Sequence, residues 1–191
     1  RCLLLSDQPV LKQVSDLLIQ AKHLGAWEGR VWIYRWGDLF ACWCSVRYGG
    51  RSLFSVLEPL LLQTHWQALA VEEGGTLYQA GEWRLIEELH GISFHLSPYA
   101  FLQGHRELSR ELWSDLVTWA CQKQGSILDL YSGIGVTGTL CAARSRKVTM
   151  VEAAPSLTAA AICTLKEHNI EAEVLTGTVE DVLPQLEAHS F

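Results

Sequence analysis

The sequence predicts an α/β protein in two parts: a small α+β domain over residues 1–96 and an incomplete parallel sheet over residues 97–191. Hydrophobic residues make up 49% of the 191 residues and charged residues only 19%, a composition typical of a folded globular chain. Up to residue 96, short β-branched and aromatic runs are separated by glycine turns, a pattern typical of strands. After residue 97, apolar strands alternate with helical stretches, which indicates βαβ units and a parallel sheet.

The first part begins with an expected helix over residues 7–24, which Ser6 or Asp7 can cap and Gly25 can end. Two β-rich runs, 31–36 and 39–47, flank Gly37-Asp38 and predict a hairpin with Cys42 and Cys44 on one face. A helix is expected next, over 52–65. Four short strands are predicted after it, over 66–71, 76–79, 84–90 and 92–96.

The second part begins with an expected helix over 105–122. Leu108, Leu112, Leu116, Val117 and Ala120 are expected on its buried side, because they recur at helical spacing. The predicted strands are 127–131, 148–152 and 173–175. Helices are predicted over 136–143 and 156–169, and a short helix begins near residue 179.

Composition also limits the class of protein. No apolar run approaches the length of a membrane span, and the start lacks the plan of a signal peptide. The six cysteines form no CxxC pair, which favours reduced thiols and a cytoplasmic protein. The net charge of -6 shows no basic footprint for nucleic acid, so any RNA-binding surface must be local. Because the only methionine is Met150, we expect a fragment of a longer protein.

A glycine motif carries the functional signal. Gly133, Gly135 and Gly138 follow a predicted strand and open a predicted helix, where backbone N–H groups can approach a ligand closely. Glu152 ends the next strand, at a place where a carboxylate can accept hydrogen bonds from both ribose hydroxyls. The combination predicts a nucleotide-like ligand.

Two ligand classes fit this motif: a dinucleotide and S-adenosylmethionine (SAM). Asp129 precedes the turn; an acidic side chain there is unfavourable beside a pyrophosphate but favourable beside the cationic amino-acid end of SAM. We therefore favour SAM. In a simpler interpretation, Asp129 only caps the turn and the glycines only allow close packing.

Three segments in order resemble the RNA 5-methyluridine methyltransferases: Phe94-His-Leu-Ser-Pro98-Tyr-Ala-Phe101-Leu-Gln103, then Asp129-Leu-Tyr-Ser-Gly133-Ile-Gly135, then Val151-Glu152. The resemblance covers about residues 90–185. It implies a Rossmann-like SAM methyltransferase sheet, here only its N-terminal part over 97–191, preceded by the central α+β domain of the family over 1–96. It also implies methylation of carbon 5 of a uridine in RNA.

The resemblance further implies residue roles. Glu152 would hold the ribose. In the ribosomal RNA branch, four cysteines bind an iron–sulfur cluster; Cys2 lies where the fourth is expected, which favours 23S ribosomal RNA over tRNA. The family's nucleophilic cysteine and general base lie downstream, so no catalytic residue is expected here and this segment alone is expected to be inactive. The residues expected to contact SAM are Gln103, Tyr131, Gly133, Gly135, Val136, Glu152 and Thr178.

Two other functions stay open. An NAD-dependent dehydrogenase would use the glycine turn and Glu152 but would leave Gln103 unexplained. A non-catalytic RNA-binding module would use Trp32, Tyr34, Trp36 and Trp43 for stacking, although core packing is the favoured interpretation of these residues. We expect RNA as the partner of the full-length protein, and no association with a membrane. The open edge of the incomplete sheet also predicts self-association as an artefact of the fragment.

Overall fold

The computed structural model describes residues 12, 15, 16, 19, 28–36, 39–61, 66–101, 103, 105–122, 124–144 and 146–186. It divides into two compact units, 1–83 and 84–191. Of the helix expected over 7–24, Lys12, Ser15, Asp16 and Ile19 are described and are helical. The rest of that helix, and Cys2, lie outside the described residues.

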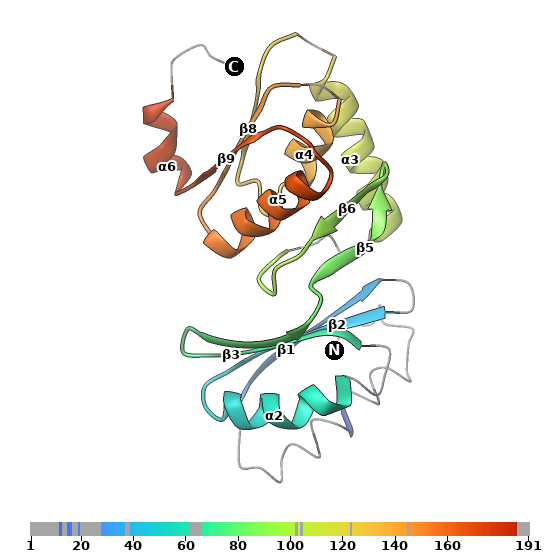
Figure 1. The fold of residues 1–191 in the computed structure, drawn as a ribbon, viewed down its shortest axis with the longest axis vertical. Helices are drawn as coiled ribbons and strands as arrows, with labels where there is room; N and C mark the ends of the chain where they lie inside the picture. The colour runs from blue at the N-terminus through green and yellow to red at the C-terminus, as the bar shows by residue number, and fades with distance from the viewer. Residues whose placement is uncertain are drawn as a thin grey trace. The chain divides into compact units, whose positions relative to one another are not determined.

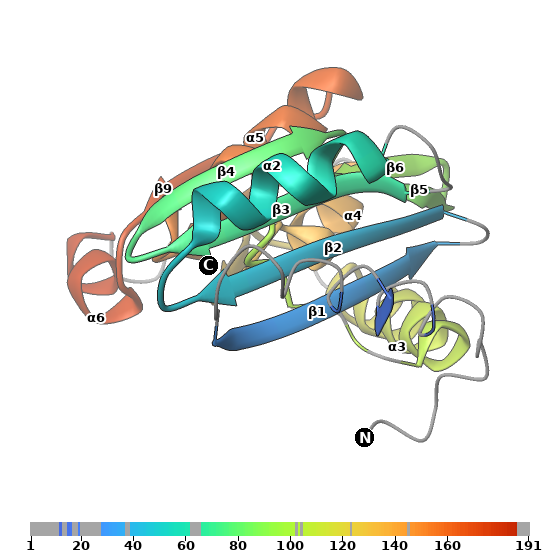
Figure 2. The same cartoon turned by 90° about the horizontal axis from the view of Figure 1, so that it is seen from below.

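The first unit is a four-stranded sheet with a helix on one face (Figure 2). β1 (Gly29–Trp36) and β2 (Leu39–Val46) form the predicted antiparallel hairpin. Helix α2 (Gly50–Leu61) then connects β2 to the parallel strand β3 (Trp66–Glu73), and β4 (Thr76–Gly81) pairs antiparallel with β3. Cys42 and Cys44 share the core face as predicted, with their Sγ atoms 3.7 Å apart.

The aromatic residues of this unit pack against one another. The rings of Trp32 and Trp43 stack with their centroids 4.1 Å apart. Tyr34 meets Trp83 edge to face at 6.0 Å. Trp32, Tyr34 and Trp43 are only half-buried, and they alternate along the strands with the core residues Val31, Ile33, Cys42 and Cys44. They therefore lie on the other face of the sheet, and the core-packing interpretation does not hold for them; the side chain of Trp36 lies outside the described part.

The second unit contains a hairpin and a parallel sheet (Figure 1). β5 (Arg84–Leu89) and β6 (Ile92–His95) form the hairpin, and α3 (Arg106–Ala120) follows. The sheet has the order β7-β8-β9 and is parallel throughout, as the alternating pattern predicted. Its elements are β7 (Ile127–Leu130), α4 (Val136–Ala142), β8 (Val148–Glu152), α5 (Pro155–Glu167), β9 (Glu173–Thr176), α6 (Val179–Val182) and a 3₁₀ turn, Leu183–Gln185.

The β5–β6 hairpin packs with the second unit. The backbone N–H of His95 donates to Thr164 Oγ1 at 2.9 Å, and the His95 ring lies 2.6 Å from the Glu167 carboxylate. The N–H of Ser93 also lies 3.1 Å from His168 Nε2. The hairpin therefore belongs to the second compact unit, which begins at residue 84, whereas the sequence predicted a domain boundary after residue 96.

The buried side predicted for α3 is wrong for three of its leucines. Leu108, Leu112 and Leu116 are 59%, 55% and 40% exposed. Val117 is buried as predicted, Ser109 is buried beside it on the covered side of α3, and the helix packs against α4. Periodicity identified the apolar row correctly, but it does not say whether another element covers that row.

Among the helices of the described part, none has the length and apolar character needed to cross a bilayer.

Candidate functional site

The glycine turn lies between the end of β7 and the start of α4, beside the end of β8. Ligands of open parallel sheets bind outside the carboxyl ends of the strands, so this turn is in the expected place. Tyr131, Gly133 and Gly135 have φ values of +57°, +59° and +75°. These three residues have the left-handed backbone conformation, so the N–H groups of the turn point in different directions.

The glycines of the motif serve different purposes. A Cβ added at Gly135 would lie 2.8 Å from Met150 Sδ, and one added at Gly138 would lie 2.5 Å from the same atom. These two glycines let α4 pack directly on β8. A Cβ at Gly133 would meet nothing within 4 Å, so the backbone of Gly133 borders open space that a ligand can enter.

Glu152 is held against the turn by two backbone groups. Its Oε2 accepts a hydrogen bond from Gly133 N–H at 3.0 Å, and its Oε1 accepts one from Ala154 N–H at 2.9 Å. A carboxylate oxygen can accept two hydrogen bonds. Each oxygen therefore keeps one acceptor position, which matches the pair of hydroxyls on a ribose.

Asp129 caps the first turn of α4, as the simpler interpretation proposed. Its Oδ2 accepts a hydrogen bond from Gly138 N–H at 2.9 Å. Burial raises the pKa of Asp129, and the hydrogen bond from Gly138 opposes that rise. The start of α4 thus already has an acidic partner, and a pyrophosphate placed there would face this side chain. The geometry disfavours a dinucleotide.

We expect the Asp129→Asn variant to lose less stability than the wild type as the pH rises. The raised pKa means that the folded state binds the Asp129 proton more tightly than the unfolded chain. This contribution to the free energy of unfolding is therefore present at acid pH and is lost as the pH rises from the ordinary value of 3.8 through the raised pKa. Asn keeps the acceptor for Gly138 but does not titrate.

Urea unfolding of both proteins from about pH 4 to about pH 7 measures this effect. As the pH rises, the unfolding free energy of the wild type should fall relative to that of Asp129→Asn. A difference that does not change with pH would contradict the assignment.

Tyr131 follows β7 directly and lies beside the turn, with 70% of its surface exposed. Its hydroxyl donates to Glu180 Oε1 at 3.2 Å. The negative charge of Glu180, and then this hydrogen bond, raise the pKa of Tyr131. The sequence did not predict this contact, because the two residues are far apart in the chain.

The other predicted site residues make no contact with Glu152 or with the glycines of the turn that the structure records. Val136 is buried at the start of α4, so its side chain does not face the open space. The hydroxyl of Thr178 donates to Asp181 Oδ2 at 2.6 Å and caps α6, so it already has a partner. Gln103 is exposed ahead of α3. Cys2 lies outside the described residues, and no group of three metal-binding side chains occurs among the described ones.

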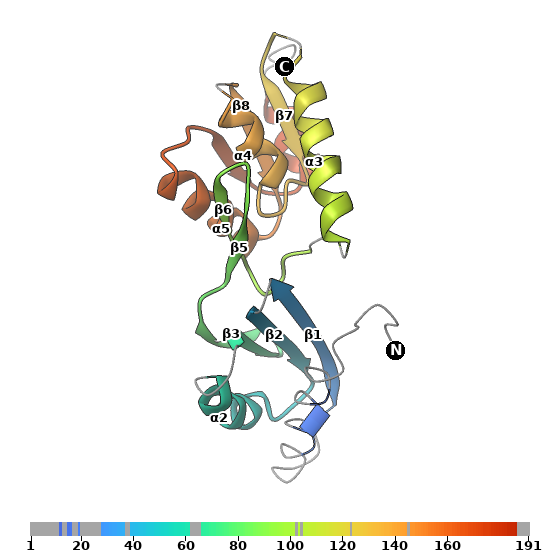
Figure 3. The ribbon, with the colours of Figure 1, turned by 90° about the vertical axis from the view of Figure 1, so that its right-hand side faces the viewer.

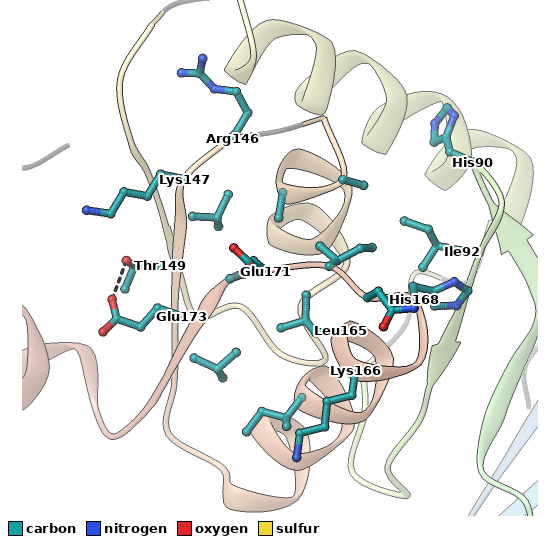
Figure 4. Close-up of a pocket in the computed structure, with 18 residues that line it drawn as sticks. His90, Ile92, Arg146, Lys147, Thr149, Leu165, Lys166, His168, Glu171 and Glu173 are labelled. Carbon is teal, nitrogen blue, oxygen red and sulfur yellow. Dashed lines mark hydrogen bonds between the residues drawn. The ribbon is translucent and has the colours of Figure 1, made fainter.

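A hollow of about 1630 Å³ lies at the opposite end of the sheet (Figure 4). It lies near the start of β8 and β9 and beside the end of α5. Neither the glycine turn nor Glu152 borders it. Lys147, Lys166, His168, Glu171 and Glu173 are among its lining residues. The hollow is therefore separate from the residues that the sequence predicted to work together.

Several curated proteins that are similar in sequence to this chain are named as RNA methyltransferases. No protein-family model matches the chain. An uncharacterized RNA methyltransferase of Lactobacillus johnsonii is 32% identical over 127 residues, which are 65% of this chain and 28% of the relative. The human tRNA (uracil-5-)-methyltransferase homolog A is 30% identical over 56% of this chain and 17% of its own length. A 23S rRNA (uracil(747)-C(5))-methyltransferase of Shewanella halifaxensis is 29% identical over 44% of this chain and 23% of its length.

A solved structure agrees with these relatives. The tRNA (uracil-54, C5)-methyltransferase of Pyrococcus abyssi, in complex with S-adenosyl-L-homocysteine, is similar over 88% of this chain and 46% of its own, with a TM-score of 0.65 and 14% identity. At that identity the likeness shows the fold. The chain spans between about a sixth and about three tenths of the curated relatives named above. The chain is similar in sequence to proteins named as RNA methyltransferases and as uracil-5-methyltransferases of tRNA and of 23S rRNA, and it has the fold of the corresponding part of the Pyrococcus abyssi protein.

Proposed function

We propose that the chain forms part of a SAM-dependent enzyme that methylates carbon 5 of a uridine in RNA, and that residues 84–191 supply part of the SAM site. The observation that carries this proposal is the contact of Glu152 with Gly133 N–H at the carboxyl end of a parallel sheet. Relatives named for tRNA and for ribosomal RNA both match the chain. Ribosomal RNA therefore stays a prediction from Cys2 alone.

The residues of the turn fit SAM. Glu152 has two free acceptor positions for the ribose hydroxyls, and Gly133 leaves room beside the backbone. The exposed ring of Tyr131 offers an apolar surface next to that room. SAM, when bound, supplies the methyl group. Gln103 would bind through its amide, Val136 and Gly135 through their backbones, and Thr178 only by giving up its bond to Asp181.

Cys42 and Cys141 do not have the environment of a nucleophile. Burial, followed by the neighbouring Cys121, raises the pKa of Cys141 to about 12. The hydrogen bond to Cys44, followed by burial, raises the pKa of Cys42. A thiol with a raised pKa is not a thiolate at neutral pH, and the thiolate is the attacking species. Cys44 is itself fully buried, whereas Cys121 is the C-cap residue of α3 and Cys163 lies on α5, so neither belongs to the glycine turn. We therefore propose that residues 1–191 alone do not methylate RNA.

We extend the proposal to partners and place. In a longer protein, RNA would be the substrate and Cys2 a ligand of an iron–sulfur cluster. The five described cysteines are free thiols, which is compatible with a reducing compartment, and we propose the cytoplasm as the place of action.

Calorimetric titration of the chain with SAM and, separately, with NAD tests this function. We expect saturable binding of SAM and no heat from NAD, because Asp129 occupies the helix start that a pyrophosphate needs. Binding of NAD without SAM would replace the proposal with a dehydrogenase. Salt-sensitive RNA binding without affinity for either cofactor would favour an RNA-binding module.

A further inference from the structure

One hydrogen bond joins the two outer strands of the parallel sheet at its carboxyl end. Its donor is the hydroxyl of Tyr131, which directly follows β7, and its acceptor is Oε1 of Glu180, on α6 after β9. Strand β8 lies between β7 and β9 and ends in Glu152. The bond therefore connects the two sides of the strand whose last carboxylate has free acceptor positions.

The backbone of Tyr131 is fixed, but its ring is not packed away. Its φ of +57° is left-handed, a conformation that few side-chain-bearing residues adopt. The next residue, Ser132, donates its N–H to Val151 O at 3.0 Å, and α4 leads from the turn back over β7 and β8 (Figure 3). The side chain remains largely exposed, and an exposed side chain changes rotamer rapidly unless a contact holds it.

The segment that carries Glu180 is anchored beside the end of β8. Gly177 N–H donates to the backbone oxygen of Glu152 at 3.0 Å. The hydroxyl of Thr178 donates to Asp181 Oδ2 at 2.6 Å and accepts from Asp181 N–H at 3.2 Å. Glu180 lies inside this closed turn, so its backbone has a defined place relative to Glu152.

We propose that Glu180 is a positioning residue of the cofactor site: by accepting the hydroxyl of Tyr131, it holds the tyrosine ring in one orientation beside the space that Gly133 and Glu152 border. This inference rests on the proposed function, in which that space receives SAM. A ring that is already ordered gives the adenosine part of SAM an apolar contact without the entropic cost of ordering the ring on binding.

Three variants separate the hydrogen bond from the charge of Glu180. Glu180→Ala removes the acceptor, and Tyr131→Phe keeps the ring but removes the donor. Glu180→Gln loses the charge but keeps an acceptor oxygen for the hydroxyl. Glu171→Ala is the matched control, because Glu171 is also an exposed carboxylate but lies at the opposite end of the sheet.

Calorimetric titration with SAM gives the first measurement. Glu180→Ala and Tyr131→Phe should each weaken SAM binding roughly threefold to tenfold, which is the range expected when one side chain must be ordered on binding. Glu180→Gln and Glu171→Ala should stay within about twofold of the wild type. The double variant of Tyr131→Phe with Glu180→Ala should bind no more weakly than either single variant, because both remove the same bond.

The orientation of the ring is measured separately, without SAM. Three-bond NMR couplings across the Cα–Cβ bond of Tyr131 report whether its side chain occupies one rotamer or several. We expect one rotamer in the wild type and in Glu180→Gln, and a mixture in Glu180→Ala. A role of Glu180 in stability alone would not produce this difference.

The outcomes distinguish this inference from the proposed function. A wild type that binds no SAM overturns the function, and the inference with it. SAM binding that is equally tight in the wild type and in Glu180→Ala overturns the inference alone. Equal weakening in Glu180→Gln and Glu180→Ala assigns the effect to charge and also overturns it, as does a Tyr131 ring that samples the same mixture of rotamers with and without Glu180.

Discussion

Replacement of Glu152 by Gln is expected to weaken SAM binding roughly tenfold to a hundredfold, since hydrogen bonds to a charged group contribute about 1.5–3 kcal/mol. The Gln amide nitrogen can only donate, so one of the two N–H groups of Gly133 and Ala154 would face a donor in place of an acceptor. The variant also removes the negative charge that strengthens bonds to the ribose hydroxyls. Calorimetric titration of SAM into both proteins measures the change.

Glu171→Gln is the matched control for this prediction. Glu171 is an exposed carboxylate that lines the hollow at the opposite end of the sheet, so its loss changes the net charge equally without touching the turn. We expect its SAM affinity to stay within about twofold of the wild type, a difference small beside the factor of ten that 1.4 kcal/mol represents. Equal affinities in Glu152→Gln and the control would remove Glu152 from the site.

Gly138→Ala is expected to destabilise the second unit by about 1–2 kcal/mol. The new Cβ would lie 2.5 Å from both Cγ and Sδ of Met150 and 3.0 Å from Asp129 Oδ2. Met150 is fully buried, so its side chain cannot move aside freely, and overpacking of this kind costs about 1–3 kcal/mol. The higher helix propensity of Ala returns up to about 1 kcal/mol, so the steric effect is the larger one.

Hydrogen exchange of α4 and β8 in urea measures this loss within the second unit, since two compact units need not unfold in one transition. A double-mutant cycle with Met150→Ala isolates the cause. Gly138→Ala should cost less in the Met150→Ala background, because the contacted side chain is then absent. Equal costs in the two backgrounds would show that the contact with Met150 is not the reason.

The sequence predicted the strands and helices of the second unit well because each has a recognisable pattern of apolar residues within its own segment. Val148, Met150 and Val151 make β8 mostly apolar, and residues 148–151 are buried. α4 and α5 pack on this strand, and β7 and β9 pair with its two edges. Leu112 shows where this reasoning fails. Helical spacing placed it correctly in an apolar row, but its burial depends on a neighbour that spacing cannot reveal.

The site shows the same division. Glu152 and the glycines could be predicted because a motif fixes their place at strand ends. The pairing of Tyr131 with Glu180 could not, because it depends on the path of the chain through two strands and two helices. Asp129 had two interpretations, and only the distance to Gly138 N–H identified it as a cap.

Met150 gives this chain a built-in spectroscopic reporter. It is the only methionine of the 191 residues, and its sulfur lies directly beneath Gly135 and Gly138. A protein labelled with ¹³C at the methionine methyl group would therefore give one NMR signal, from a position under the glycine turn. A ligand that reshapes the turn would shift that signal, whereas events confined to the first unit would leave it in place.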